Sequence, residues 1–146
     1  MRNVTQIKPF HECDMKNISS RIDVLSHTDM KTLILMASSG FTHTFFVNGK
    51  PGAIVGANIL WPSVAQVWAI TSDIIRGYGL WYTKMVDWLL TEGAKCNKIR
   101  RYHCIVDGSN QENIRWLYSL NFGFEFCMYK AAPDGSNVFG YVRWEV

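Results

Sequence analysis

A glycine-containing segment in the middle of the chain, Arg76-Gly77-Tyr78-Gly79, has residue types that can bind a phosphate group. An apolar run, AQVWAIT, precedes it, and an amphipathic segment that ends at Gly93 follows it. This pattern predicts a strand, a turn and a helix whose first turn starts at the glycines. The first N–H groups of a helix lack intrahelical partners and lie at the positive end of its dipole, so they can bind phosphate. The alternative is structural, because glycine also permits a tight turn between a strand and a helix.

Length and composition are typical of one folded domain. The chain has 146 residues, of which 48% are hydrophobic and 18% charged, so it can bury a core and we expect a single domain over residues 1–146. The net charge of +3 is too small and too dispersed to favour a nucleic-acid partner. No apolar run approaches the roughly 18 residues that span a bilayer, and the N-terminus lacks the apolar segment of a signal peptide. We therefore expect an intracellular protein without a membrane partner.

The four cysteines lie far apart and form no C-x-x-C pair. Their spacing does not predict a zinc site, and we expect no metal. Cys104 and Cys127 lie in apolar, strand-like runs, so we expect free, buried thiols there.

Hydrophobic periodicity predicts strands and helices along the first half of the chain. We expect a strand over residues 4–8, one or two short helices within residues 10–25, and a helix over residues 28–37 capped by Thr28 or Asp29.

A hairpin and a central helix are predicted next. Asn48-Gly49, between two β-rich runs, is a typical hairpin turn, and Gly56 in the second strand indicates a close backbone approach. The helix after the glycines carries a predicted apolar stripe of Leu80, Trp81, Met85, Trp88 and Leu89.

The C-terminal part reads as a strand, a helix and a closing hairpin. The strand covers residues 101–106, and the helix covers residues 111–120 with Ser109 or Asn110 as its cap. Asn121 suits the left-handed backbone position that ends a helix. Residues 124–130 and 138–144 form the hairpin.

This order of elements predicts an α/β (α+β) fold. The strand, helix, strand unit implies parallel neighbours with a right-handed crossover, whereas the hairpins imply antiparallel neighbours. We therefore expect a mixed, mainly antiparallel sheet of about six to seven strands with helices on both faces.

The glycine segment and its place in this order resemble the GNAT superfamily of acyl-CoA-dependent N-acetyltransferases. The first motif of that family is Arg or Gln, two residues, Gly, one residue, and Gly or Ala, at the start of the helix after the fourth strand. Arg76 and Gly79 match it, and Trp81 stands where the family has a small residue.

A second motif of the same family runs from an Asn through a helix containing Ile-Arg and Tyr to Leu-Gly-Phe. Residues 110–122, NQENIRWLYSLNF, follow this spacing. Asn121 replaces the Gly, and Leu117 occupies the position of the Tyr that often serves as general acid, one residue before Tyr118.

The resemblance implies acetyl-CoA as co-substrate and an amine of a small molecule or a protein as acceptor. The pyrophosphate and pantetheine of acetyl-CoA would lie against the fourth strand and the turn after it. The residues implied are Ile70, Thr71, Arg76, Gly77, Tyr78, Gly79 and Leu80. Asn110 would lie near the cofactor as well as cap its helix.

Direct attack of the amine on the thioester requires a group that deprotonates an ammonium and one that reprotonates a thiolate. Asp73 and His103 are the candidate bases, and Tyr118 is the candidate acid. Each has a structural alternative: Asp73 can stabilise the turn, His103 can be a core residue, and Tyr118 can pack its helix. Trp81 either fills the cofactor groove or packs into the core.

Two longer stretches, residues 49–73 and 108–122, look like a small GNAT-like family of short-tailed bacteriophages that includes an internal virion (core) protein. This resemblance implies a location in the host cytoplasm or in the virion, with phage core proteins or host proteins as partners. The alternative to an enzyme is thus a catalytically silent virion or host-binding protein. Exposed tryptophans, with Trp61, Trp81 and Trp144 as candidates, would supply its contact surface, and a homo-oligomer is a further expectation.

Overall fold

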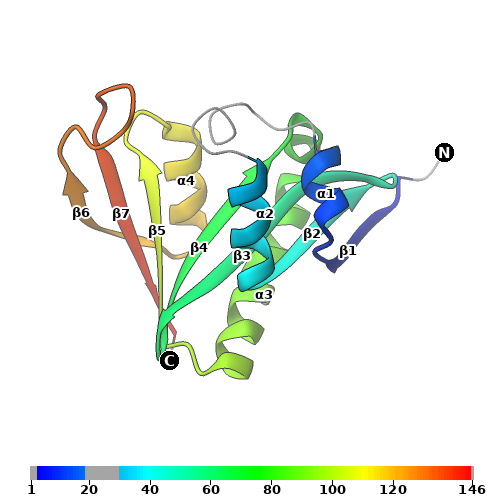
Figure 1. Cartoon of the computed structure of the whole chain (residues 1–146), viewed down its shortest axis with the longest axis horizontal. Helices are drawn as coiled ribbons and strands as arrows, with labels where there is room; N and C mark the ends of the chain where they lie inside the picture. The colour runs from blue at the N-terminus through cyan, green and yellow to red at the C-terminus, as the bar shows by residue number, and fades with distance from the viewer. Residues whose placement is uncertain (1–2, 19–29, 146) are drawn as a thin grey trace. The chain divides into compact units, whose positions relative to one another are not determined.

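The computed structural model of the chain describes residues 3–18 and 30–145. In chain order its elements are β1 (Thr5–Pro9), α1 (Glu12–Asn17), α2 (Met30–Ser39), β2 (Phe41–Val47), β3 (Lys50–Trp61), β4 (Val64–Thr71), the 3-10 helix η1 (Asp73–Tyr78), α3 (Gly79–Asn97), β5 (Arg101–Asp107), α4 (Gln111–Ser119), β6 (Gly123–Met128) and β7 (Val138–Trp144) (Figure 1). The predicted caps Thr28 and Asp29 lie outside the described residues, as do residues 19–25 of the first predicted helical region.

The strands form a mixed, mainly antiparallel sheet of seven strands in the order β1-β2-β3-β4-β5-β7-β6. β4 and β5 run parallel, as a right-handed crossover through α3 requires, whereas β1 with β2, β2 with β3, β5 with β7 and β6 with β7 run antiparallel. The predicted fold class is confirmed.

The chain divides into two compact units. The first contains Met1–Asn58 and Trp68–Tyr82, and the second contains Ile59–Val67 and Thr83–Val146, so β4 and α3 each contribute residues to both. The expectation of one domain over residues 1–146 stays a prediction.

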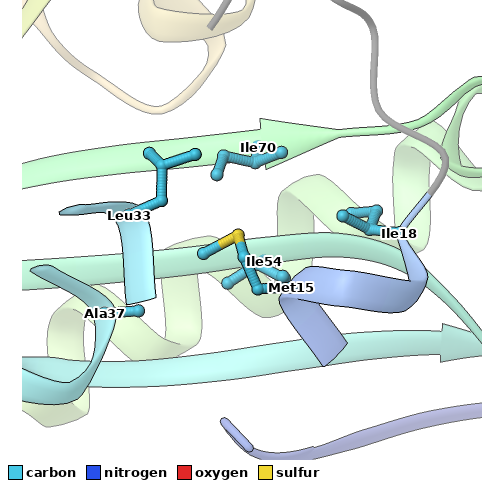
Figure 2. Close-up of a cluster of buried hydrophobic side chains, with 6 residues drawn as sticks. All are labelled: Met15, Ile18, Leu33, Ala37, Ile54 and Ile70. Carbon is cyan, nitrogen blue, oxygen red and sulfur yellow. The ribbon is translucent and has the colours of Figure 1, made fainter. Parts of the chain in front are cut away.

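In the first unit, helices cover both faces of the sheet. On one face, α1 and α2 pack against β3 and β4, with a buried cluster shown in Figure 2. Its members are Met15, Ile18, Leu33, Ala37, Ile54 and Ile70. On the other face, the start of α3 packs on buried Phe45, whose ring centroid lies 5.5 Å from that of Trp81 and 5.1 Å from that of Tyr82. The edge-on geometry of both pairs is the one that aromatic quadrupoles favour.

The β2–β3 hairpin and its glycine follow the sequence prediction. Asn48 and Gly49 both have positive φ, 50° and 79°, as a two-residue hairpin turn requires. A Cβ on Gly56 would lie 2.4 Å from the Trp68 ring, so the close approach predicted there is confirmed. Trp68 Nε1 donates to Asn58 Oδ1 at 2.6 Å, and Asn58 Nδ2 donates to the carbonyl of Met36 at 2.8 Å. Gly56 thus makes room for a ring that links two strands to α2.

In the second unit, α3 and α4 pack on the same face of the sheet. The hydroxyl of Tyr102 in β5 donates to the Leu90 carbonyl in α3 at 2.8 Å. Trp116 of α4 donates to Thr83 Oγ1 of α3 at 3.0 Å. Figure 1 shows β5, β7 and β6 side by side in that order.

The predicted end and apolar stripe of the long helix were wrong. α3 continues past Gly93 to Asn97 and ends where Lys98 takes a positive φ of 56°. Continuing the helix buries Ala94, which offsets the cost of about 1 kcal/mol for an interior glycine. The buried stripe is Tyr82, Val86, Leu90 and Ala94, whereas the predicted members Leu80 and Trp88 are exposed.

The thiols also differ in part from expectation. All four cysteines are free, but Cys127 is exposed, because β6 is the outer strand of the sheet. Cys104 is partly buried, and burial raises the pKa of its thiol to about 12. Among the described residues, no helix is long and apolar enough to cross a membrane.

Candidate functional site

The junction between β4 and α3 is helical rather than an open turn. α3 begins at Gly79, as predicted, but the 3-10 helix η1 fills the segment before it. Ser72 is the last extended residue, and both its N–H and its hydroxyl donate to the Gly52 carbonyl at 2.9 Å. The first N–H groups of α3 are therefore preceded by carbonyl groups of η1. In a helix that starts directly from a strand, no helical carbonyl groups precede the first N–H groups.

Gly77 and Gly79 face open space. Apart from the chain neighbours and the backbone of the same helix, no heavy atom lies within 4 Å of a Cβ built on either residue. Neither has a positive φ, and Gly79 has ordinary helical angles of −55° and −40°. The backbone at both positions is one that any residue adopts. What glycine provides here is unobstructed access to the backbone.

Charged and apolar side chains surround these glycines. Arg76 Nε lies 3.8 Å from Asp73 Oδ1, and both side chains are more than half exposed. Ile74 is 36% exposed, and Leu80 is 82% exposed although it is a leucine in the first turn of α3. The junction thus offers one guanidinium and two exposed apolar side chains to a ligand, whereas Tyr78 is half-buried.

Trp81 packs into the core, in line with the core-packing alternative. Its ring contacts Phe45, which is fully buried. The indole therefore does not point to the open side of the glycines. Trp81 replaces the small residue of the first motif without obstructing that side.

Ile70 and Thr71 end β4, next to this junction. Within the first unit, residues 68–71 form the outer strand of the sheet. The parallel ladder with β5 covers only Val64 to Gln66, in the other unit. Within the first unit, the backbone N–H and C=O groups on one edge of residues 68–71 therefore have no neighbouring strand. An extended ligand can hydrogen-bond to such an edge.

Asn110 caps α4 in the second unit. Its side-chain oxygen accepts from the N–H of Asn113 at 3.1 Å. The cap prediction is confirmed, and so is the left-handed position after the helix, because Asn121 has a φ of 65°.

Tyr118 lies on the face of the second unit that α3 and α4 cover. Its ring packs edge-on against Tyr141 in β7 at 5.6 Å between centroids, and its side chain is half exposed. Burial raises the pKa of Tyr141, and the charge of Tyr118 and a side-chain hydrogen bond with it add to this effect. Leu117, in the position of the second-motif tyrosine, is buried and offers no acid.

His103 lies on the opposite face of the same sheet. Tyr102 points to α3, and side chains alternate along a strand, so His103 points away from α3. Burial lowers its pKa, the charge of Arg101 lowers it further, and Glu125 raises it. Its Nε2 atom is buried without a hydrogen-bond partner among the described residues. A neutral imidazole with a free acceptor or donor atom can exchange a proton.

The candidate residues fall into two sets. Those from Ile70 to Leu80, with Asp73, lie along one continuous segment of the first unit, and His103, Asn110 and Tyr118 lie in the second unit. In the described residues, no hydrogen bond joins the three members of the second set. No group of three or more His, Cys, Asp or Glu side chains there is placed to hold a metal.

Asp107 is a residue to which the sequence analysis assigned no role. Its Oδ1 atom accepts from the N–H and the hydroxyl of Ser109, at 2.8 and 2.7 Å, and from the hydroxyl of Ser136 at 2.9 Å. It therefore fixes the start of α4 to the loop between β6 and β7. The sequence Asp-Gly-Ser signals the local part of this arrangement, whereas the distant Ser136 has no local signal.

No protein-family model matches the chain, and no curated protein matches it in sequence. Solved structures do match it in shape. Ard1 from Thermoplasma volcanium has a TM-score of 0.81 at 16% sequence identity, covering 97% of this chain and 98% of that one. The chain has the GNAT fold.

Two further structures with the GNAT fold carry information on ligands. An acetyltransferase from Salmonella typhimurium that modifies the N-terminal serine of ribosomal protein L7/L12 has a TM-score of 0.78 at 16% identity, with 97% and 95% of the two chains covered. RimL, a ribosomal L7/L12 α-N-protein acetyltransferase in complex with coenzyme A, has a TM-score of 0.71 at 16% identity, with 96% and 93% covered.

Two half-buried histidines, His43 and His103, predict how stability depends on pH. Burial lowers the pKa of His43 and of His103, so the unfolded chain takes up these protons first as the pH falls. Their contribution to stability is present above about pH 6.5 and is lost as the pH falls through the lowered values. We expect a lower melting temperature at pH 5.5 than at pH 7.5, and a smaller difference in the double variant His43→Gln, His103→Gln. Equal differences in the two proteins, measured by circular dichroism, would contradict this.

Proposed function

We propose that the chain is an acyl-CoA-dependent N-acetyltransferase that transfers an acetyl group from acetyl-CoA to an amine. The observation that carries the proposal is the open backbone at Gly77 and Gly79. Neither conformation nor packing requires glycine there, and access by a ligand gives both residues a purpose. The GNAT fold of the chain and the coenzyme A bound to RimL support the same ligand.

In this proposal acetyl-CoA lies along the first unit's strand edge and junction. The pantetheine, which carries amide groups, would hydrogen-bond to the backbone of Ile70 and Thr71. The pyrophosphate would lie at residues 76–80, where the guanidinium of Arg76 is exposed and the backbone at Gly77 and Gly79 is open. Leu80 and Ile74 would contact the apolar parts of the ligand.

The reaction needs two proton transfers. The amine nitrogen attacks the thioester carbonyl carbon, the C–N bond forms, and the C–S bond breaks with the electron pair moving to sulfur. The ammonium must lose one proton to a base, and the thiolate of coenzyme A gains one from an acid.

His103 stays a candidate base and Tyr118 a candidate acid, and because they lie on opposite faces of the sheet a single site can use only one of them. Burial keeps the pKa of His103 below its ordinary value, so the imidazole is neutral at pH 7 and can accept a proton. Tyr118 is half exposed on the opposite face of the sheet, where its hydroxyl can donate. Asp73 is the second candidate base, since its carboxylate is largely exposed beside the junction.

The acceptor is proposed only as a class. Both the Salmonella enzyme and RimL act on a protein α-amine. We infer that the acceptor is an amine of a small molecule or of a protein.

Acetylation of two probe acceptors, a peptide with a free N-terminal serine and a small polyamine, tests the roles of the residues. With the product measured by mass spectrometry, we expect His103→Gln to lower kcat by about 100-fold, because general-base catalysis contributes at least that much. Asp73→Asn tests the second candidate base and should keep the rate if His103 is the base. Loss of the rate in Asp73→Asn with a normal rate in His103→Gln would transfer the role of base to Asp73.

Exposed tryptophans favour a second candidate, a non-catalytic interaction module. Trp61 and Trp144 are 58% and 62% exposed, whereas Trp81 is not exposed. Large exposed aromatic side chains are typical of contact surfaces. If the resemblance to the phage family extends to function, the partners would be phage core or host proteins, met in the host cytoplasm or in the virion. Phage origin and location stay predictions.

A further inference from the structure

Three segments of the second unit that are far apart in the sequence meet at one end of its sheet. The carbonyl of Ser63, in the turn between β3 and β4, accepts from the N–H groups of Arg100 and Arg101 at 2.9 and 3.2 Å. The carbonyl of Arg100 accepts from the N–H of Glu145, just after β7, at 2.8 Å. Figure 1 shows the end of β7 and the starts of β4 and β5 together at this end of the sheet. The three segments therefore form one tip.

The end of β3 brings large apolar side chains to this tip. Ile59 and Leu60 are 50% and 41% exposed, and Trp61, which follows them, is also exposed. Side chains alternate between the two faces of a strand, so Ile59 and Trp61 point to one face and Leu60 to the other. Both faces of this strand end are therefore exposed. A single exposed apolar residue is ordinary on a protein surface, whereas three in succession indicate a contact surface.

A second exposed indole lies in the same region. Arg101 of β5 pairs with Val64 of β4 and with Trp144 of β7, so these three side chains share a face. Trp61 and Val64 flank the two-residue turn between β3 and β4, which places them opposite each other on that face. Trp61 and Trp144, both more than half exposed, therefore lie in one row across the tip.

Cations without acidic partners lie beside these apolar side chains. Lys98 and Arg100 are exposed in the connection from α3 to β5. In the part of the chain that the structure describes, neither of them takes part in an ion pair, whereas Arg101 pairs with Glu125. We call the two cations and the four apolar side chains the tip surface: Ile59, Leu60, Trp61, Lys98, Arg100 and Trp144.

This combination of side chains fits the surface of a bilayer that contains anionic lipids. Aliphatic side chains enter the boundary of the acyl chains, indoles lie at the level of the headgroups, and Lys and Arg attract anionic headgroups. Single-stranded nucleic acid is also anionic, but its bases stack on planar rings, and Ile59 and Leu60 have none. The guanidinium of Arg101 already lies over the ring of Trp144, 5.2 Å from its centroid. The aliphatic side chains and the covered ring therefore favour lipid.

We propose that the tip surface docks the protein on a membrane surface that carries anionic lipids, without crossing the membrane. The apolar side chains at the end of β3 insert between headgroups and acyl chains, and Lys98 and Arg100 contact lipid phosphates. The expectation of no membrane partner rested on continuous apolar runs, whereas this surface is assembled from three separate segments. This proposal does not depend on the proposed acetyl transfer.

Co-sedimentation with lipid vesicles tests the proposal, with the protein alone as background. We expect the wild-type protein to bind vesicles of phosphatidylcholine and phosphatidylglycerol at least about tenfold more strongly than vesicles of phosphatidylcholine, because each exposed cation contributes about fivefold. Trp61→Ser should weaken binding to the mixed vesicles by about tenfold or more, because it removes an inserted ring. The double variant Lys98→Gln, Arg100→Gln should weaken it by about 25-fold. Circular dichroism melts check that these tip variants fold.

The matched controls change the same residue types elsewhere in the second unit. Trp88→Ser removes an exposed indole of α3, and the double variant Lys84→Gln, Lys130→Gln removes two exposed cations. Both should bind the mixed vesicles within about twofold of the wild type. A wild-type protein that does not bind the mixed vesicles, or equal losses in tip variants and controls, would overturn the proposal. Nucleic acid would be the occupant instead if the tip variants weaken binding of a single-stranded oligonucleotide and leave vesicle binding unchanged.

Discussion

Replacement of Arg143 by methionine is expected to lower the free energy of unfolding by about 3–5 kcal/mol, the cost of removing one partner from a buried ion pair. Only 7% of Arg143 is exposed. Its guanidinium donates to Glu145 at 2.6 Å, to Asp87 at 2.9 Å and to the carbonyl of Leu120 at 3.2 Å. The arginine therefore ties β7 to α3 and to the end of α4, and methionine leaves Glu145 largely buried without its cation.

Urea denaturation followed by circular dichroism measures this change. Lys95→Met is the control, because Lys95 pairs with Glu92 at 3.2 Å on the surface, where ion pairs contribute about 0–1 kcal/mol. A loss of less than about 1 kcal/mol for Arg143→Met would show that the buried pair is replaceable by an apolar side chain.

Gly56→Ala is expected to lower the free energy of unfolding by about 3 kcal/mol. The added methyl group would lie 2.4 Å from the Trp68 ring and 2.8 Å from Thr42 Oγ1. The ring has little room to move, because its N–H is held by Asn58 Oδ1 at 2.6 Å, and Asn58 is in turn bonded to α2. A shift of the ring breaks these hydrogen bonds, which adds to the cost of overpacking.

Gly123→Ala is the matched control, since nothing lies within 4 Å of a Cβ at that position. We expect it to change the melting temperature by no more than a few degrees. If Gly56→Ala unfolds at the same urea concentration as the wild type, the Trp68 ring is not held as the structure indicates.

Local sequence chemistry predicted the turns and caps of this protein well. Few residue types tolerate a positive φ, which identified Asn48-Gly49 and Asn121. Few side chains cap a helix, which identified Asn110. Gly56 was recognised as a close approach for a similar reason, although its partner Trp68 was not predicted.

The buried side of α3 was not predictable in the same way. Apolar residues occur on more than one side of this helix, so Leu80 and Trp88 fit a stripe as well as Val86 does. Which side is buried depends on the strands that it contacts, and those contacts join residues far apart in the sequence. Exposure of Cys127 has a similar origin, since the order β5-β7-β6 places its strand at the sheet edge.

In the candidate site, too, local features could be predicted from the sequence, whereas features that depend on tertiary contacts could not. Motif spacing identified the glycines and Asn110: the structure shows open space beside Gly77 and Gly79, and Asn110 caps α4. The spacing of residues in the sequence could not show that His103 and Tyr118 lie on opposite faces of the sheet. They follow from the direction of Tyr102 toward α3 and from the contact of Tyr118 with Tyr141.

Binding of acetyl-CoA to the purified protein, measured as a shift in melting temperature, tests the central claim most directly. At about 100 times its dissociation constant, a ligand stabilises the native state by roughly 2.7 kcal/mol, which moves the midpoint by several degrees. Gly79→Arg should abolish the shift without unfolding the protein, because the backbone at Gly79 is ordinary and the space beside it is open. Gly123→Arg, at an equally open glycine, should keep the shift. No shift in the folded wild-type protein, or equal shifts in all three proteins, would contradict a cofactor site at these glycines.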